Sequence, residues 1–548
     1  MPPRFRRAEP MTTFELVPDD ELEDAPGTTP DEEPTDGRRR TGRRRTALRD
    51  RAVARWRALP RRGRVAVAAG TAVVVVAATA AAVTPGLLDA RAERLRAEAV
   101  QGMPGVVGDL SDPVETTWSL PEGSSLAAVL PGGVLAVTGS DGVRAVDAAT
   151  GDVVWEHPFD DAATCGPTPW TAVDWSAPVD SVVCVEDLSR VTVLDADGTV
   201  VSERELDLLE PVDAPGEDDA GVSSWSQVLP AAGRTVAVLD QESPVNEVPW
   251  REGDDAASLL RTLRDAGWHD PSLRIIDAVT GEVRAEVSVR LTEGALEECG
   301  VVEDGQGGRT VAPQPWVDAT PSSTTLGLCG LTRAVTPTGE SIDIGDDWQS
   351  LVAEPDGGYL VPGETSAILD AHGERRATIH GLAVTPTIDT EPSAPRLALL
   401  GADGSAPALA AFGTGDVPAW SVSIDPLTTP LARVGDTIVL ADDSSVMALD
   451  ARTGDRRWRL AGLLDADPEE GETVTGVVTD GTRLLLAISP NTWTDDDGAG
   501  VPRRLVALDL RDGSTTWERA GRGMVSGLFS ADGNPVSVGS AVSGLAAP

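Results

Sequence analysis

The chain has 548 residues, with 88 acidic and 45 basic side chains and a net charge of -43 at pH 7. Residues 1–64 carry a net charge of +4, so the rest of the chain carries -47. Nucleic acids and anionic lipids are bound mainly through Lys and Arg. These values therefore exclude nucleic acid as a partner of the main domain.

The first 63 residues have the composition of a disordered tail. Residues 9–36 contain 11 acidic and no basic side chains, whereas residues 37–64 contain 13 Arg and one Asp. Such segments bury too little apolar surface to fold. An alternative gives this tail a function, in which the Arg cluster binds anionic headgroups and the acidic part recruits a cytoplasmic partner.

An uncharged stretch follows the Arg-rich segment. VAVAAGTAVVVVAATAAAVT (65–84) has 20 apolar or small residues, enough to span about 30 Å of hydrocarbon as a helix. We predict an uncleaved transmembrane signal anchor at residues 64–88, with the tail in the cytoplasm because positive flanks stay inside. The alternatives are a cleaved signal peptide with its cleavage site near Ala80–Ala82, and a buried helix of a soluble protein.

The part of the chain beyond this span divides into a stalk and an all-β domain. Residues 89–114 are expected to form a juxtamembrane stalk that begins with the helical composition of DARAERLRAEAV (89–100). From residue 115 onward, short Val, Leu and Ala runs alternate with Gly, Asp and Pro. This pattern predicts short strands with regular turns over residues 115–548.

All four cysteines, Cys165, Cys184, Cys299 and Cys329, lie beyond the predicted membrane span. Their number and isolation are typical of two disulfides in an oxidising compartment, and they do not match the ligand spacing of a zinc site. Three pairings are possible. We favour nearest neighbours, Cys165 with Cys184 and Cys299 with Cys329, because each bridge then closes one short loop.

Four segments align without a gap. They are VRAVDAATGDVVWE (143–156), LRIIDAVTGEVRAE (273–286), VMALDARTGDRRWR (446–459) and LVALDLRDGSTTWE (505–518), each with Asp fifth and Gly ninth. The apolar run before the Asp predicts a strand that is covered on both faces. Repeats of such strands indicate a β-propeller or a solenoid.

Each residue that the four segments share has a structural explanation. The Asp carboxylate accepts hydrogen bonds from turn N–H groups, and the Gly supplies a positive φ. A Trp four residues after the Gly is interpreted as packing between blades rather than stacking on a ligand, although Ala285 replaces it once. The residues assigned to blade packing are Asp147, Asp277, Asp450, Asp509, Gly151, Gly281, Gly454, Gly513, Trp155, Trp458 and Trp517.

Weaker copies of the repeat determine the number of blades. They occur at 191–200, 333–344, 366–375 and 409–420 and raise the number of anchor positions to eight. We therefore predict a propeller of seven to eight four-stranded blades, seven remaining possible because a long insert separates the second and third anchors. The segment ETTWSL (115–120) is expected to pair with the last blade and close the ring.

The pattern apolar-x-A-L-D-x-x-T-G-x-x-x-W resembles the blade repeat of the pyrroloquinoline quinone (PQQ) type propellers over about residues 115–548. Members of that family include periplasmic quinoprotein dehydrogenases and non-enzymatic proteins such as an outer-membrane assembly lipoprotein. The resemblance implies PQQ and calcium in the central channel only for the enzymes. This sequence lacks the adjacent cysteine pair that many of these enzymes have, although some quinoproteins lack it too. No matching channel cluster can be placed either, so no catalytic, cofactor or metal residue is transferred.

The resulting hypothesis is a non-catalytic, extracytoplasmic binding or scaffold module of the bacterial cell envelope, anchored in the plasma membrane by one helix. Its expected partner is an envelope protein or polymer, and no cofactor is expected. One alternative is a PQQ-dependent dehydrogenase, and another is a sensor that couples the propeller to a cytoplasmic partner. The candidate binding loop is CGPTPWTAVDWSAPVDSVVC (165–184), with Trp170 and Trp175 either presented to a ligand or packed on the blade beneath.

Overall fold

The chain divides into two units, Met1–Leu88 and Asp89–Pro548. The computed structural model describes only residues of the second unit: 91, 94–169, 174–175, 177–208, 224–242, 248–250, 255–299, 301–303, 309–345, 351–354, 357–401, 406–413, 417–467, 471–490, 502–522 and 525–547. The predicted tail (1–63) and membrane span (64–88) lie outside these residues. Among the residues that are described, no helix is both long and apolar enough to cross a membrane.

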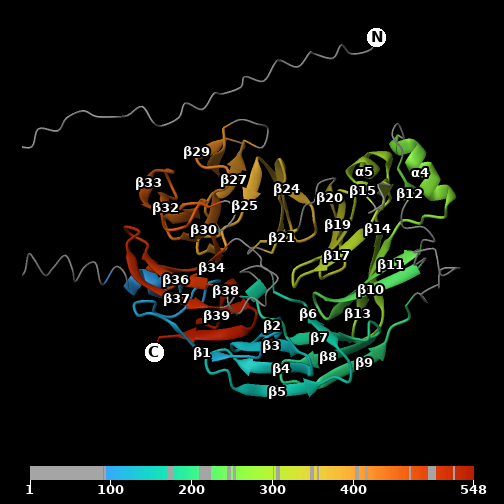
Figure 1. Ribbon diagram of the computed structural model, residues 1–548, viewed down its shortest axis with the longest axis horizontal. Helices are drawn as coiled ribbons and strands as arrows, with labels where there is room; N and C mark the ends of the chain where they lie inside the picture. The colour runs from blue at the N-terminus through green and yellow to red at the C-terminus, as the bar shows by residue number, and fades with distance from the viewer. Residues whose placement is uncertain are drawn as a thin grey trace, which may run out of the picture. The chain divides into compact units, whose positions relative to one another are not determined.

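The second unit is all-β, and its sheets follow one another in chain order around a ring (Figure 1). Nine sheets of the described residues are blades, each an antiparallel set of four strands, and the seventh carries an additional parallel strand. We number them blades 1 to 9. In blades 1 and 2 the first strand lies nearest the ring centre and the fourth lies outermost (Figure 1).

The first five blades alternate short strands with tight turns. Blade 1 contains β2 (Ser125–Leu130), β3 (Val134–Gly139), β4 (Gly142–Asp147) and β5 (Val153–Pro158). Blade 2 contains β6 (Ala163–Gly166), β7 (Ser181–Glu186), β8 (Arg190–Asp195) and β9 (Val200–Glu205). Blade 3 contains β10 (Ser224–Ala231), β11 (Thr235–Glu242), β13 (Ser272–Asp277) and β14 (Val283–Ser288). Blade 4 contains β17 (Pro315–Ala319), β18 (Thr324–Leu328), β19 (Leu331–Val335) and β20 (Ser341–Gly345). Blade 5 contains β21 (Val352–Ala353), β22 (Tyr359–Val361), β23 (Thr365–Leu369) and β24 (Arg375–His380).

The remaining blades follow the same order until the ring closes. Blade 6 contains β25 (Leu382–Val384), β27 (Arg396–Leu400), β28 (Ala408–Phe412) and β29 (Pro418–Ser423). Blade 7 contains β30 (Thr429–Val434), β31 (Thr437–Ala441), β32 (Ser445–Asp450) and β33 (Arg456–Ala461), with β26 (Ile388–Asp389) added in parallel to β30. Blade 8 contains β34 (Glu472–Thr479), β35 (Arg483–Pro490), β36 (Pro502–Asp509) and β37 (Thr515–Arg522). Blade 9 contains β38 (Val525–Ala531), β39 (Asn534–Gly539), β40 (Val542–Ala546) and β1 (Glu115–Ser119).

The prediction of seven to eight blades was wrong by at least one, and the reason lies in the repeat itself. Each Asp–Gly anchor occupies the hairpin between the third and fourth strands of a blade. In blade 9 the third strand is β40 and the fourth is β1, which come from opposite ends of the domain and pair antiparallel. No hairpin joins them, so eight anchors correspond to nine blades. The expected closure of the ring by residues 115–120 is correct.

Both faces of the blades are buried over the second and third strands, as the apolar strand runs predicted, whereas fourth strands such as β5 and β9 are largely exposed. The buried side chains form nine clusters, each shared by two neighbouring blades, so that the last cluster joins blade 9 to blade 1. In that closing cluster, Phe529 of β38 packs with Leu135 and Val146 of blade 1. Apolar burial therefore continues around the whole ring.

The segment before β1 packs on the ring. Residues 94–100 are helical, and the chain then runs beside blade 8, where the backbone N–H of Val107 donates to the Thr479 carbonyl (2.8 Å). Leu110 is 1% exposed, and its N–H donates to the buried carboxylate of Asp480 (3.0 Å). Part of the predicted stalk region is thus held by the domain.

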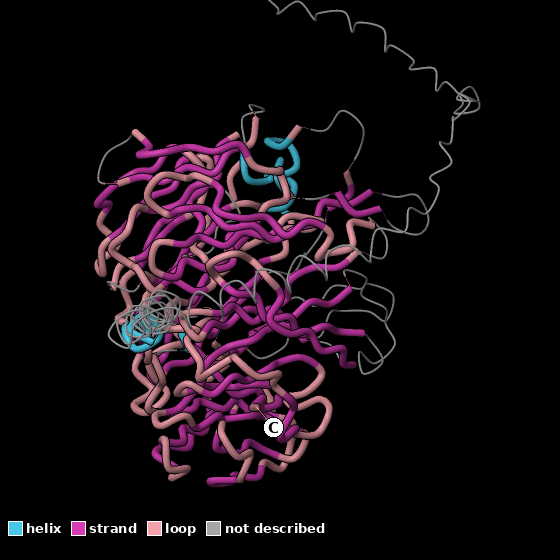
Figure 2. The backbone as a smooth tube through the Cα atoms, turned by 90° about the vertical axis from the view of Figure 1, so that its left-hand side faces the viewer, coloured by secondary structure: helices cyan, strands magenta, loops and turns pink. Residues whose placement is uncertain are grey.

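An insert in two parts lies before and after the last two strands of blade 3, and its first part, with β12 and α4, accounts for the long gap between the second and third anchors. It consists of α4 (Ala256–Asp265), α5 (Glu293–Glu298) and a sheet of β12 (Val248–Pro249), β16 (Arg309–Val311) and β15 (Val301–Glu303). Strands dominate the unit and helices are confined to small regions (Figure 2).

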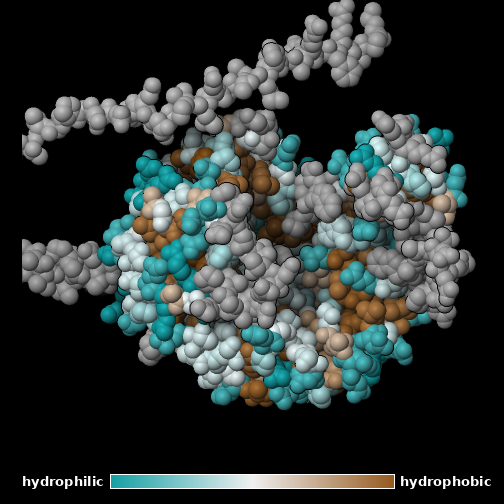
Figure 3. All heavy atoms as spheres, in the orientation of Figure 1, coloured by the Kyte–Doolittle hydropathy of each residue, from teal (hydrophilic) through white to brown (hydrophobic). Residues whose placement is uncertain are grey.

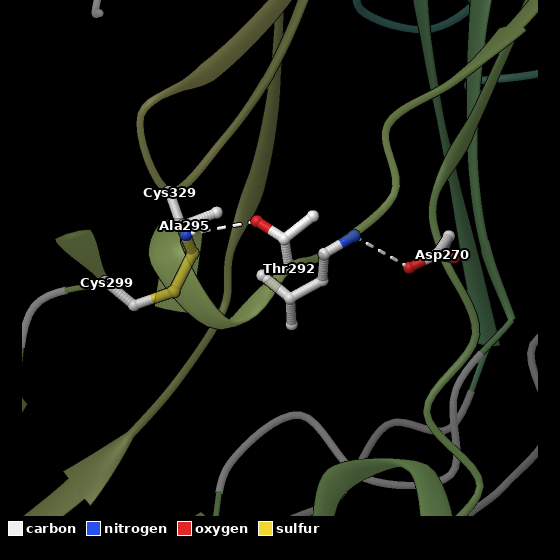
Figure 4. The surroundings of a disulfide bond; sticks show 6 residues. Asp270, Thr292, Ala295, Cys299 and Cys329 are labelled. Atoms are coloured by element: carbon white, nitrogen blue, oxygen red, sulfur yellow. Dashed lines mark hydrogen bonds between the residues drawn. A yellow bond between two sulfur atoms is a disulfide. The ribbon is translucent and has the colours of Figure 1, made fainter. Parts of the chain in front are cut away.

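Both helices of the insert begin at a residue whose side chain caps them. The Asp255 carboxylate accepts from the N–H of Ser258, and the Thr292 hydroxyl accepts from the N–H of Ala295 (Figure 4). These bonds satisfy N–H groups that the first turn of a helix leaves free. The caps therefore stabilise both helices of the insert.

Candidate functional site

The hairpin aspartates hold the turns of the repeat. Asp147 Oδ1 accepts from the N–H groups of Ala149 (3.0 Å) and Thr150 (2.9 Å), and Gly151 has a φ of +74°. The hairpins that begin at Asp277 and Asp450 use the same bonds. These residues lie at the ends of outer hairpins, where they stabilise turns.

Each repeat tryptophan of the outer strands reaches the hairpin of the next blade. The indole N–H of Trp155 donates to Ala196 O (3.0 Å), and that of Trp458 donates to Leu510 O (3.0 Å). In both cases the acceptor is the residue after the hairpin Asp. Trp517 donates to Leu110 O (2.8 Å), because blade 9 has no such hairpin and the segment before β1 takes its place.

The ring of a tryptophan lies over the hairpin glycine. A Cβ added at Gly513 would lie 2.5 Å from Cε3 of Trp458, and one at Gly454 would lie 2.7 Å from Cε3 of Trp420. Glycine is therefore required for space as well as for its positive φ. Trp118 and Trp420 make the same contacts with the Ala148 and Ala451 carbonyls. Sequence reasoning assigned neither residue to blade packing. Trp118 lies in a strand without its own hairpin, and Trp420 ends one of the weaker copies of the repeat.

The blade 2–3 interface uses an arginine in place of tryptophan. The Nε of Arg204 donates to Ala278 O (3.2 Å), the carbonyl that follows the hairpin Asp277, and its guanidinium lies against Gly281. Ala285, which replaces Trp in blade 3, packs against a cluster that includes the insert. Arg204 therefore makes the contact with the next hairpin that a Trp makes at other blade interfaces.

Both disulfides join the nearest-neighbour pairs favoured by the sequence. Cys165 and Cys184 are register partners on β6 and β7, so the bridge ties two strands of blade 2. Cys299 follows α5, and Cys329 follows β18, so the second bridge attaches the insert to blade 4 (Figure 4).

The candidate binding loop has one aromatic in the described part of the chain. Trp170 lies outside it. Trp175 stacks on Phe529 of blade 9, with ring centroids 4.6 Å apart, and it also lines a cavity at the ring centre. Trp175 therefore both packs on blade 9 and lines this cavity.

The central cavity has a volume of ≈ 350 Å³. Its wall comes from blades 4 to 7, and above all from their first strands: Asp318 on β17, Val352 on β21, Val384 on β25 and Arg433 on β30. Pro104, from the segment before β1, also lines it. The space-filling view shows this face of the ring hollowed, with hydrophobic residues around the hollow (Figure 3).

Two of the cavity carboxylates are paired with arginines. Arg396 forms an ion pair with Glu354, which is 5% exposed. Arg433 is also 5% exposed and forms an ion pair with Asp389, its register partner on the parallel strand β26. A second bond joins Arg433 Nε to Asp389 Oδ1 (2.9 Å). Burial makes such pairs costly to break, because the remaining charge would be unpaired.

Asp318 differs from these two carboxylates. It forms no ion pair with any described residue, although solvent reaches it through the cavity. Desolvation by the surrounding protein raises the pKa of the Asp318 carboxyl. This residue was not identified from the sequence, since it lies on an inner strand outside the repeat motif.

The cavity residues do not fit a calcium ion with a bound quinone. Calcium takes six to eight oxygen ligands, several of them carboxylates. Glu354 and Asp389 are neutralised by arginines, and no group of three or more His, Cys, Asp or Glu within the described ranges is placed to hold a metal ion. We therefore derive no redox step for this cavity.

Comparisons with known proteins agree with the sequence repeat. Residues 403–543, which cover most of blades 6 to 9, match the family model described as outer membrane protein assembly factor BamB. This part of the chain carries the PQQ-like repeat. No curated protein shows significant sequence similarity to the chain.

Several solved structures are similar to the chain at low identity. The crystal structure of BamB from Moraxella catarrhalis is 12% identical, with 79% of this chain and 99% of that chain covered and a TM-score of 0.35. The quinohemoprotein alcohol dehydrogenase from Comamonas testosteroni is 14% identical, with 82% and 78% covered and a TM-score of 0.34. A europium-containing methanol dehydrogenase is 13% identical, with 79% and 86% covered and a TM-score of 0.32.

Proposed function

We propose that this protein is a non-catalytic binding module of the bacterial cell envelope. In this proposal the propeller lies outside the cytoplasm, and residues 65–84 anchor it in the plasma membrane. The observation that carries the proposal is the internal pairing of the cavity charges, Arg396 with Glu354 and Arg433 with Asp389. A ring in which two of the three cavity carboxylates are already neutralised offers shape and contact surface rather than a metal or cofactor site.

Two further observations support the location and the type of partner. All four cysteines are joined in disulfides, which is typical of an oxidising compartment. The family model matched by residues 403–543 describes an assembly factor, so a protein of the envelope is the proposed partner. The acidic charge of the domain makes nucleic acid an improbable ligand.

Proximity labelling in living cells tests the proposal directly. A labelling enzyme fused to the C-terminus of the full-length protein is expected to mark extracytoplasmic envelope proteins. The same enzyme fused to the N-terminus serves as the matched control and is expected to mark cytoplasmic proteins. Identical cytoplasmic proteins marked by both fusions would contradict the proposed topology.

The dehydrogenase alternative has a separate test. The full-length protein is mixed with PQQ and calcium, and reduction of a redox dye is followed with alcohols or sugars as substrates. Our proposal predicts no reduction above that of a heat-denatured sample. Substrate-dependent turnover would replace the binding function with an enzymatic one.

A further inference from the structure

The five charged side chains that line the central cavity do not balance. Arg396 and Arg433 neutralise Glu354 and Asp389. Asp318 has no cationic partner among the described residues, so the cavity carries one excess negative charge. The Asp318 side chain is exposed in the cavity, whereas Glu354 and Asp389 are held by their arginines. Asp318 is therefore the lining carboxylate that a cation from outside the chain can reach and pair with.

Beside Asp318 lie hydroxyl groups that suit an ammonium group. Thr320, Ser322 and Ser323 form the turn that follows β17, and all three line the cavity. The hydroxyls of Thr320 and Ser322 lie 3.1 Å apart, with either one as the donor. An ammonium group has three hydrogen-bond donors. One carboxylate with neighbouring hydroxyl acceptors complements this arrangement. The Thr320 hydroxyl already accepts from the N–H groups of Ser322 and Ser323, so the acceptors nearest to Asp318 along the chain are the hydroxyls of Ser322 and Ser323.

Beside the Arg396–Glu354 pair, blades 5 and 6 supply apolar side chains to the cavity lining. Val352, Leu360, Val384 and Leu397 contribute side chains from blades 5 and 6. A volume of ≈ 350 Å³ lies at the lower end of the range for small-molecule pockets. The ligand that fits is therefore compact, with an apolar body and one positive charge at its end.

We propose that the central cavity binds a primary amine, with the ammonium group at Asp318 and an apolar body against the inner strands of blades 5 and 6. This inference goes beyond the proposed function, because an envelope scaffold does not require a small-molecule site. The amine comes either from a free small molecule or from a lysine side chain of a partner protein. Both sources present the same chemistry to Asp318.

Calorimetric titration of the full-length protein tests the proposal. The probes are 2-phenylethylamine, its neutral counterpart 2-phenylethanol, and Nα-acetyl-lysine amide as the lysine arm. We expect saturable binding of at least one amine and at least tenfold weaker binding of the alcohol. Asp318→Asn removes the charge without changing the shape of the side chain, so it is expected to weaken amine binding at least tenfold and to leave alcohol binding unchanged.

Two further variants separate charge from shape. Asp443→Asn removes an exposed carboxylate of the β31–β32 turn outside the cavity lining and is expected to bind amines like the unmodified protein. Val384→Phe fills the cavity and is expected to weaken both amine and alcohol. Tighter binding of 2-phenylethylamine than of Nα-acetyl-lysine amide assigns the site to free amines, and the reverse assigns it to a lysine of a partner.

Equal amine affinity in the unmodified protein and Asp318→Asn would overturn the proposal, as would the absence of saturable binding by any of the three probes. Either result would leave the proposed envelope function intact, because proximity labelling does not depend on the cavity. Conversely, a failure of the labelling experiment would not alter the titration. The two proposals are therefore tested separately.

Discussion

The outer and inner strands of the blades differ in how regularly they are built. The outer hairpins repeat one set of contacts, with an Asp that holds the turn, a Gly that makes room and a Trp from the preceding blade. The inner strands vary, with Asp318 in blade 4, Val352 in blade 5 and Val384 in blade 6 facing the same cavity. The repeated residues of the outer hairpins therefore stabilise the ring, whereas the variable residues of the inner strands line the cavity that we propose as a binding site.

The difference between outer and inner strands is tested most strongly by replacing Trp458. Its side chain is 8% exposed, its indole N–H is bonded to Leu510 O, and it packs on Gly513. Trp458→Ala is expected to lower the free energy of unfolding by about 3–5 kcal/mol, the typical cost of removing a large buried aromatic. Denaturant unfolding measures this change, and Trp458→Phe, which keeps most of the apolar area, is the control. A loss below about 1 kcal/mol would show that the outer contacts do not hold the ring.

The second disulfide joins the insert to blade 4, the blade that follows one without the repeat Trp. The Cys299–Cys329 bridge closes 30 residues between the insert and blade 4, beside the blade in which Ala285 stands in place of Trp. Changing both cysteines to Ala is expected to lower stability by roughly 3 kcal/mol. The comparison is sharpened by making the same double change at Cys165 and Cys184, which closes 19 residues within one blade. Thermal unfolding midpoints under non-reducing conditions give both values.

A glycine pair separates backbone strain from contact with tryptophan. Gly513 has a φ of +72° and Trp458 beside it, whereas Gly123 has a φ of +81° and no atom within 4 Å of an added Cβ. Gly123→Ala is expected to cost about 1 kcal/mol from backbone strain alone. Gly513→Ala is expected to cost about 1–3 kcal/mol more, because the Cβ overpacks the interface. Equal losses of unfolding free energy for the two variants would mean that the Trp458 ring moves aside without destabilising the interface.

The hairpin aspartates predict a loss of stability in acid. A hydrogen bond from the Arg457 guanidinium, followed by the backbone N–H of Arg452, lowers the pKa of Asp450. Because the folded pKa is lowered, this stability is present above the unfolded value of about 3.9 and is lost as pH falls through the folded value. Asp450→Asn is expected to flatten the decline of the unfolding free energy below about pH 4. An unchanged dependence of the unfolding free energy on pH would show that the Asp450 carboxylate does not stabilise its hairpin.

The smallest effect on stability is expected at the cavity. Desolvation raises the pKa of Asp318, but its side chain is exposed, so water screens most of the cost of its ionised form. Asp318→Asn should therefore leave the unfolding free energy within about 0.5 kcal/mol of the unmodified value, with a small increase at pH 7. A large loss of stability would place Asp318 among the structural residues and would break the distinction between inner and outer strands.

Much of the fold could be predicted from the sequence because the outer hairpins are chemically constrained. A turn with positive φ and no space beside it accepts little except Gly, and Asp147 or Asp450 is needed to bind the turn N–H groups. Because these requirements are the same in each blade, the same residues recur in the sequence. The ninth blade could not be counted in this way, since the pairing of β1 with β40 replaces its hairpin.

The cavity could not be predicted for the opposite reason. Asp318 and Arg433 lie on first strands, which precede the recurring motif and differ from blade to blade. The partners of the paired charges are separated by 42 and 44 residues along the chain, and the packing of consecutive blades brings them together. The sequence did identify Trp175, which lies at the cavity, because two tryptophans between paired cysteines are unusual.

Hydrogen exchange of the full-length protein with and without 2-phenylethylamine tests most directly whether the inner strands bind while the outer strands stabilise. The account predicts slower exchange on amine addition at residues 315–325, 351–354 and 382–397, and no change in the outer hairpins. Protection confined to outer hairpins such as 147–153 or 450–456, with none at the inner strands, would contradict it.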